Sequence, residues 1–104
     1  MTETFERELV QRINRNFLDI QILKLNEKKP MWGYRIMKYI EENYSVTLRH
    51  GVLYPLLNEL EQKGFLTSEK ERQNGRTRRV YSVTQKGKRY LEAYRSVLKE
   101  QIHH

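Results

Sequence analysis

The chain has 104 residues, the length of one domain, and its 20 Lys and Arg against 13 Asp and Glu give it a net charge of +7. It contains no cysteine, which excludes disulfides and thiolate metal sites and favours a cytoplasmic location. No apolar run approaches the roughly 20 residues of a membrane span, and no secretion signal opens the sequence. We interpret His103 and His104 as the remnant of a purification tag.

The positive charge is concentrated in one part of the chain. Residues 65–95 contain nine Lys or Arg against three Glu, whereas the other residues contain eleven against ten. A clustered basic surface is typical of a protein that binds a polyanion. The same cluster could also serve only to keep the protein soluble.

The first predicted element is one long amphipathic helix over residues 5–26. Its apolar side chains recur every three or four residues, at Phe5, Leu9, Ile13, Phe17 and Ile20. A small body cannot cover such a stripe, so we expect part of it to contact a second copy of the chain. Pro30 ends the helix, because the residue before a proline is disfavoured in the α conformation.

Two short helices follow. Residues 33–43 place Gly33, Ile36, Met37 and Ile40 on one face. The next helix ends at Lys63-Gly64, a standard helix stop, and carries a core stripe at Leu53, Leu56, Leu57 and Leu60. Two short helices joined by a tight turn form a helix-turn-helix.

A hairpin and a last helix complete the chain. Residues 65–72 and 77–83 are strand candidates around Asn74-Gly75, the dipeptide that best tolerates a tight turn. Thr84 can cap a helix that runs from about residue 85 to 102. That helix carries a long, thin apolar stripe, which is typical of a helix that pairs with another helix.

The order helix, helix, helix, hairpin, helix predicts a fold that is mainly α with a small β-hairpin, a winged helix-turn-helix. We expect one winged-helix domain over residues 1–104. Residues 1–28 form its N-terminal dimerisation helix, 29–84 the winged helix-turn-helix core and 85–102 the C-terminal dimerisation helix. The expected dimerisation residues are Phe5, Leu9, Ile13, Phe17, Tyr90, Leu91, Tyr94 and Leu98.

In such a module the third helix enters the DNA major groove with its N-terminal residues. A proline or glycine costs little there, because the first N–H groups of a helix have no partner within it. We favour DNA contact for Arg49 and Tyr54. For His50 and Asn58 an ordinary solvent-facing role is equally open.

The hairpin carries four arginines around an exposed turn, and such wings reach phosphates or the minor groove. Alternation places Arg78 and Arg79 on opposite faces of the strand, so we expect only one of them to point at DNA. Lys86 opens the last helix, where a cation opposes the helix dipole, which suggests an external anion. Gly87 could equally mark a packing constraint.

Three blocks resemble the PadR family of winged-helix repressors: GYRIMKYIEE (33–42), GVLYPLLNELEQKGFL (51–66) and GRTRRVYSVTQKGKRYL (75–91). The resemblance implies a homodimer formed by the first and last helices, and operator binding by the third helix and the wing. It adds Tyr34 to the DNA-proximal residues. The expected DNA-binding residues are therefore Tyr34, Arg49, His50, Tyr54, Asn58, Arg72, Arg76, Arg78, Arg79 and Lys86.

The sequence departs from the family pattern at Gly51-Val52, where Gly-Thr is usual, and in its single short C-terminal helix. Some short members bind aromatic small molecules in the dimer seam. The residues that could line such a pocket, or simply form core, are Phe5, Phe17, Trp32, Tyr90 and Tyr94.

We therefore predict a sequence-specific DNA-binding transcriptional regulator, a homodimeric repressor of a palindromic operator. Two alternatives stay open: a sequence-neutral architectural DNA protein, and a winged-helix module whose basic wing binds an acidic protein. An enzyme is not expected, because His50 is the only histidine outside the tail and Asp19 the only aspartate. No phosphate loop or metal-ligand spacing occurs, so no cofactor is expected.

Overall fold

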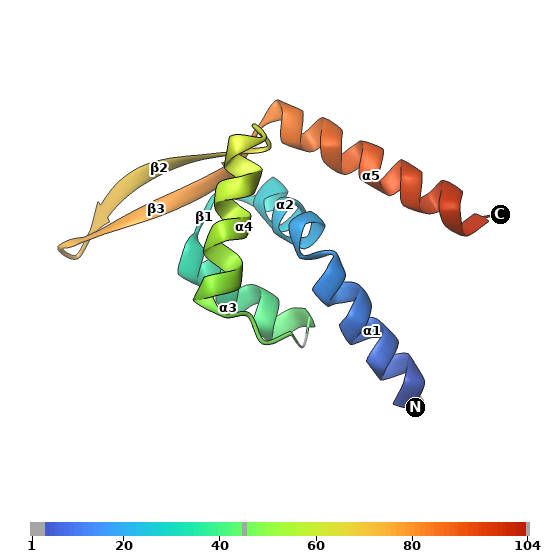
Figure 1. Cartoon of the computed structure of the whole chain (residues 1–104). Helices are drawn as coiled ribbons and strands as arrows, with labels where there is room; N and C mark the ends of the chain where they lie inside the picture. Colours follow the sequence, from blue (N-terminus) through green and yellow to red (C-terminus); the bar gives the residue numbers. More distant parts are fainter. Residues whose placement is uncertain (1–3, 45, 104) are drawn as a thin grey trace.

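A computed structural model describes residues 4–44 and 46–103 of the chain. A small central body carries two projections: the hairpin extends from one side, and α1 and α5 extend from the other (Figure 1). This is the predicted mainly α, winged helix-turn-helix fold. The elements in chain order are α1 Thr4–Asn16, α2 Leu18–Lys28, β1 Met31–Trp32, α3 Gly33–Tyr44, α4 His50–Gln62, β2 Leu66–Gln73, β3 Arg76–Val83 and α5 Gln85–His103.

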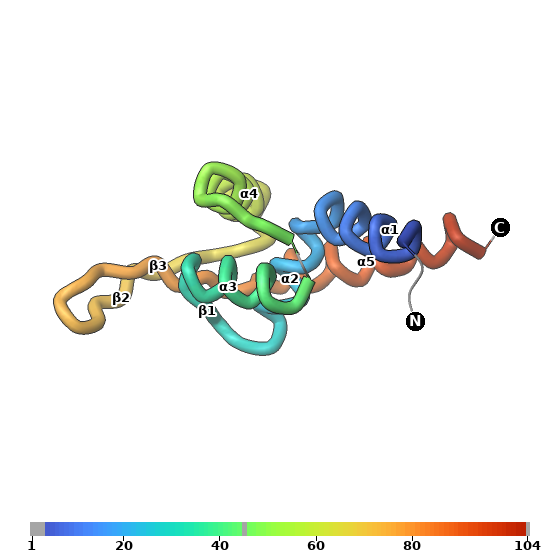
Figure 2. Tube along the Cα trace, turned by 90° about the horizontal axis from the view of Figure 1, so that it is seen from below, coloured from blue at the N-terminus to red at the C-terminus, as the bar shows by residue number. Residues whose placement is uncertain are grey.

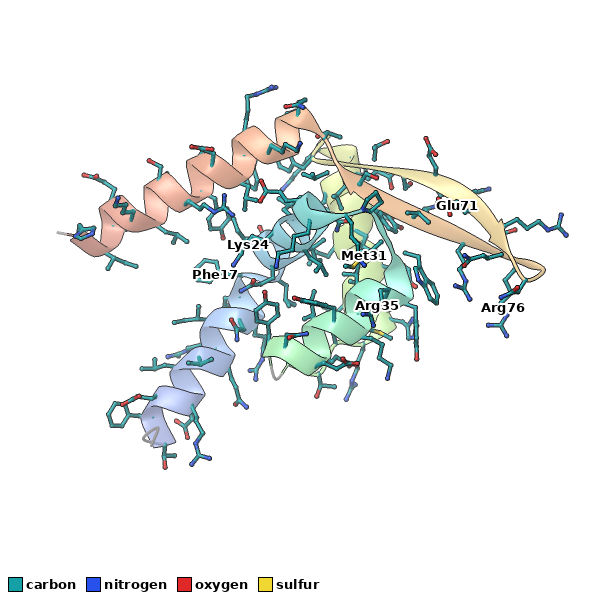
Figure 3. The ribbon with its side chains drawn as sticks, turned by 180° about the vertical axis from the view of Figure 1, so that it is seen from behind. Phe17, Lys24, Met31, Arg35, Glu71 and Arg76 are labelled. Atoms are coloured by element: carbon teal, nitrogen blue, oxygen red, sulfur yellow. The ribbon has the colours of Figure 1, made fainter. Side chains whose placement is uncertain are left out.

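The first helix is broken, which corrects the single helix predicted over residues 5–26. Phe17 has φ −113° and ψ 31°, and it separates α1 from α2 (Figure 3). α2 lies in the body with Ile22 and Leu23 fully buried, whereas α1 contains no buried residue. The break allows α2 to face the core while α1 leaves the body, and the apolar spacing continues through it unchanged.

A third strand joins the hairpin, where we had predicted two strands only. β1 pairs antiparallel with β3 through Met31↔Tyr81 and Trp32↔Val80, so the sheet order is β1-β3-β2. Two residues are too few to show the alternation that identifies a strand. β1 runs directly into α3, and it therefore ties the helix-turn-helix to the base of the hairpin.

The turn of the hairpin is the predicted one. Asn74 (φ 52°) and Gly75 (φ 78°) both have left-handed backbone, as a tight two-residue hairpin turn requires. β2 and β3 are paired without interruption from Leu66↔Val83 to Gln73↔Arg76. The register therefore fixes which wing side chains share a face.

One apolar core connects the helices to the base of the sheet. Its fully buried members are Ile22, Leu23, Ile36, Ile40, Leu53, Leu57, Leu66 and Leu91. Leu91 is a correction, because we expected it at a dimer interface. It is buried within its own chain since α5 packs against α2, and it is not available to a partner.

The joint between β3 and α5 is tightly built. The Thr84 Oγ1 accepts a hydrogen bond from the Gly87 N–H (2.9 Å), which is the predicted cap, and donates one to the Gly64 carbonyl (2.6 Å). A Cβ on Gly87 would lie 2.2 Å from the Phe65 carbonyl oxygen and 2.7 Å from Val83 Cγ2. Gly87 is thus required by packing.

Within residues 4–44 and 46–103, no helix combines the length and the apolar character that crossing a bilayer requires. His103 ends α5, and His104 lies outside the described residues.

Gly87→Ala should lower the free energy of unfolding by about 1–3 kcal/mol or more, because a backbone carbonyl occupies the space of the new methyl group. Gly51→Ala in α4 is the matched control, since nothing lies within 4 Å of its Cβ position and alanine favours a helix by up to about 1 kcal/mol. Urea unfolding followed by circular dichroism measures both. Equal effects of the two substitutions would refute the packing role of Gly87.

Candidate nucleic-acid interface

The outward face of the first turns of α4 carries few side-chain atoms. Leu53 and Leu57 point into the core, and the residues on the opposite side, Gly51, Pro55 and Asn58, are exposed. α4 begins at His50, so Pro55 lies inside the helix and cannot donate to the Gly51 carbonyl. Gly51 has no neighbour that a side chain would meet. This face can therefore come very close to a flat partner.

Tyr54 joins α4 to the start of α3. A Cβ on Gly33 would lie 2.9 Å from both the Cε1 and the hydroxyl oxygen of Tyr54, so the phenol ring rests on the Gly33 backbone. The His50 ring stacks on Tyr54 with 5.6 Å between centroids and 10° between planes. Tyr54 keeps 37% of its surface exposed. It fixes the contact between the two helices and positions His50, while its outer edge stays accessible.

The start of α3 presents a second group of aromatic and basic side chains. Tyr34 is 43% exposed, and its ring lies 5.4 Å from that of Trp32. The Lys38 Nζ lies 5.7 Å from the centroid of Tyr34. Arg35, on the same first turn, is exposed (Figure 3). Arg49 is exposed immediately before α4.

The two faces of the wing differ in charge. Residues directly opposite each other in an antiparallel pair share a face. On the outer part of the hairpin, one face consists of Lys70, Arg72, Thr77 and Arg79, and we call it the wing basic face. It contains no carboxylate. The other, the mixed wing face, consists of Glu69, Glu71, Gln73, Arg76, Arg78 and Val80.

The wing basic face is the one turned toward α4. Arg79 Nη1 donates to the Ser68 Oγ (2.9 Å), and that hydroxyl donates to the Glu61 carboxylate of α4 (2.6 Å). The sequence interpretation missed Lys70, which lies directly opposite Arg79. The Asn74-Gly75 turn could have identified it, because a two-residue turn fixes the cross-strand pairs.

Arg78 and Arg79 lie on opposite faces, as alternation predicted. Arg76, beside the turn, is exposed near the tip of the wing (Figure 3). Arg78 instead folds back, with its guanidinium carbon 3.7 Å from the centroid of the Trp32 ring. Its Nη1 donates to the Gln73 side-chain oxygen (3.1 Å).

Lys86 lies at the opposite end of α4 from His50. Its Nζ is 5.5 Å from the centroid of the Phe65 ring, and its side chain passes the Cβ position of Gly64 at 3.5 Å. The C-terminal end of a helix carries partial negative charge and attracts cations, so the C-terminus of α4 explains the position of the Lys86 side chain. An external anion is not needed to explain it.

Three of the five aromatic residues that could line a pocket in the dimer seam, or simply form core, contact one another in the single chain: Phe17, Tyr90 and Tyr94. Phe17 and Tyr94 meet edge to face at 5.8 Å, and Tyr90 stacks on Phe65 at 4.1 Å. Burial raises the pKa of the Tyr94 hydroxyl. Trp32 lies apart in β1, beside a shallow hollow of about 260 Å³ at the wing. Phe5 is 61% exposed on α1.

The two projecting helices also carry exposed apolar side chains. Leu9, Val10 and Ile13 of α1 are each about half exposed, and Val97 is 58% exposed on α5. Leu98 is partly buried. In the described part of the chain, no group of three or more His, Asp or Glu side chains is arranged to hold a metal ion.

Comparison with known proteins gives one consistent result. The family model described as "Transcriptional regulator PadR-like family" matches residues 22–93. The curated transcriptional regulator Rv3488 of Mycobacterium tuberculosis is 46% identical over 50 residues, which cover 48% of this chain and 47% of that protein. The match thus spans about half the length of this relative.

Two solved structures share the fold. A PadR family transcription regulator from Clostridium difficile R20291 is 29% identical with a TM-score of 0.75, over 84% of this chain and 92% of that one. Bacillus subtilis PadR, solved in complex with operator DNA, is 30% identical with a TM-score of 0.70. That match covers 75% of this chain and 45% of the Bacillus protein.

Gly33→Ala should destabilise the protein by about 1–3 kcal/mol, because the new methyl group displaces the Tyr54 ring. In combination with Tyr54→Ala, which removes the ring, the same substitution should cost much less than it does alone. Urea unfolding of the two single variants and the double variant measures the coupling. Additive losses would show that Gly33 and Tyr54 do not constrain each other.

Proposed function

Because the chain belongs to the PadR-like family of transcriptional regulators, we propose that it binds a palindromic operator as a homodimer and represses transcription. The family consists of transcription regulators rather than enzymes. One observation carries the proposal. The wing basic face is turned toward α4, whose first turns are exposed, so a single duplex can contact both.

α4 is the element proposed to enter the major groove. With no side chain at Gly51 and only the compact ring of Pro55, its backbone can approach the base edges closely. Arg49 can bond guanine or a phosphate, and the Asn58 amide suits adenine. His50, held on the Tyr54 ring, offers a further donor or acceptor. The carboxylate of Glu59, further along the helix, repels phosphate, so only the first half of α4 is used.

The wing is proposed to bind the sugar–phosphate backbone. Lys70, Arg72 and Arg79 present three cations on the face turned toward α4, and phosphate contacts of this kind fix the register of a protein on DNA. Arg76, at the tip, is suited to the minor groove, where arginine is favoured. Tyr34 at the start of α3 is proposed to lie beside the backbone.

The homodimer is proposed to form through α1 and α5. Within the chain, α1 has no buried residue, and its apolar side chains Phe5, Leu9 and Ile13 are exposed. An exposed apolar helix face of this size marks an interface, and a second copy of the chain offers an identical face to pack against it. The exposed Val97 lies on the neighbouring projecting helix. The same seam is the proposed place for an aromatic effector, with Phe5 as its most exposed aromatic residue.

Selection of bound fragments from sheared genomic DNA should yield a palindromic site. The protein should bind that site at least about 10³-fold more tightly than a scrambled duplex of equal length, because base contacts add to the phosphate contacts. Fluorescence anisotropy at about 150 mM salt measures both affinities.

The two alternative functions give different outcomes in this experiment. Equal, strongly salt-dependent affinities would indicate an architectural DNA protein instead. No binding to either duplex at this salt concentration would indicate a protein-binding module.

Leu9→Glu combined with Ile13→Glu should produce monomers, because two carboxylates cannot be buried in an apolar seam without a partner. Light scattering measures the mass, and operator affinity should fall with the loss of the dimer. Gln11→Glu, on an exposed polar position of the same helix, is the control and should stay dimeric. A doubly substituted protein that remains a dimer would place the interface elsewhere.

A further inference from the structure

Arg78 is separated from the three cations of the wing basic face that are proposed to bind the DNA backbone. It lies on the mixed wing face, directly opposite Glu71 and on the side away from Lys70 and Arg79. None of the ion pairs in residues 4–44 and 46–103 involves Glu71. The guanidinium therefore does not pair with the carboxylate on the neighbouring strand, and its carbon lies 3.7 Å from the centroid of an aromatic ring instead.

The contact of Arg78 with Trp32 is close. The guanidinium carbon is 3.7 Å from the ring centroid, well inside the range of about 6 Å for a cation–π contact. Arg78 Nη1 also donates a hydrogen bond to the side-chain oxygen of Gln73, near the wing tip (3.1 Å). This bond restrains the guanidinium on its outer side. Arg78 is half-buried, although every side chain from Glu69 to Thr77 is exposed. It is thus the outermost wing residue that packs on the body.

Trp32 connects this contact to the recognition helix. β1 pairs with β3 only at Val80 and Tyr81, and Arg78 extends the anchorage two residues further along the wing. Trp32 is followed directly by Gly33, on which the Tyr54 ring of α4 rests. A continuous path therefore runs from the wing through β1 and the start of α3 to α4.

Beyond Arg78, the wing is exposed throughout residues 69–77. The hairpin projects far beyond the helices in two perpendicular views (Figures 1 and 2). A two-stranded ribbon without a packed face is only marginally ordered and can twist about its base. The direction in which the wing basic face points therefore depends on how the ribbon is held where it leaves the body.

We propose that Arg78 and Trp32 form a brace that sets the angle between the wing and α4, so that Lys70, Arg72 and Arg79 reach the phosphate backbone. Arg78 is then a positioning residue and not a phosphate ligand, and Trp32 is its platform. This inference rests on the proposed function, because it concerns how the wing meets DNA.

A double-mutant cycle tests the brace with a labelled random-sequence duplex at low salt, so that no operator is required. Arg78→Ala, Trp32→Leu and the double variant should each weaken binding by a similar factor, about threefold to tenfold, because each removes the same contact. Trp32→Phe, which keeps an aromatic ring, should bind the duplex nearly as tightly as the unsubstituted protein and more tightly than Trp32→Leu. Arg79→Ala is the matched control on the other face, and its loss should add to that of Trp32→Leu.

The emission of Trp32, the only tryptophan in the chain, gives an independent readout. Arg78→Ala should change this emission in the free protein. Saturating the unsubstituted protein with duplex should not reproduce that change, because Arg78 stays on the ring. This measurement needs no substitution of Trp32, so it remains decisive if Trp32→Leu fails to fold.

Two results would overturn the brace. One is additive losses for Arg78→Ala and Trp32→Leu, and the other is emission that shifts on DNA binding to that of the Arg78→Ala variant. Either would show that Arg78 does not act through Trp32 in the complex, while leaving the proposed function intact. If the unsubstituted protein binds no duplex at low salt, the proposed function fails, and the brace fails with it.

Discussion

Tyr54 can lie across the first residue of α3 only because Gly33 has no side chain. This close approach fixes how α4 crosses α3, and the ring that makes it also carries His50. Gly33 in turn follows β1, whose pairing with β3 attaches the hairpin to the same point. Three elements, α4, α3 and the wing, thus meet at Gly33, and their relative positions depend on its lack of a side chain.

Much of this arrangement follows from local sequence signals. The Asn74-Gly75 turn, the Thr84 cap and the leucine stripe of α4 act within a few residues, and the structure confirms them. The features that the sequence did not reveal depend on distant contacts. The apolar spacing continues across Phe17, so only the packing of α2 shows the break. The stripe of α5 could not indicate that Leu91 packs on its own chain.

The candidate interface was predictable to a similar extent. Alternation separates Arg78 from Arg79, but only the Ser68–Glu61 hydrogen bond shows which of the two faces α4. The register that follows from the turn adds Lys70. The carboxylates of Glu69 and Glu71 lie on the opposite face, where they do not repel a phosphate bound by the wing basic face. The wing basic face therefore presents its cations without a carboxylate of the outer hairpin beside them.

The Thr84 hydroxyl caps α5 by accepting from the Gly87 N–H, and it donates to the Gly64 carbonyl in the turn that ends α4. Gly87 packs against the Phe65 backbone. The helix proposed for dimerisation is therefore rigidly attached to the end of the helix proposed to read bases. In a symmetric dimer, such stiffness fixes the distance between the two copies of α4. An operator of this protein would tolerate changes in its outer bases better than one inserted base pair at its centre, because an insertion rotates and shifts one half-site relative to the other.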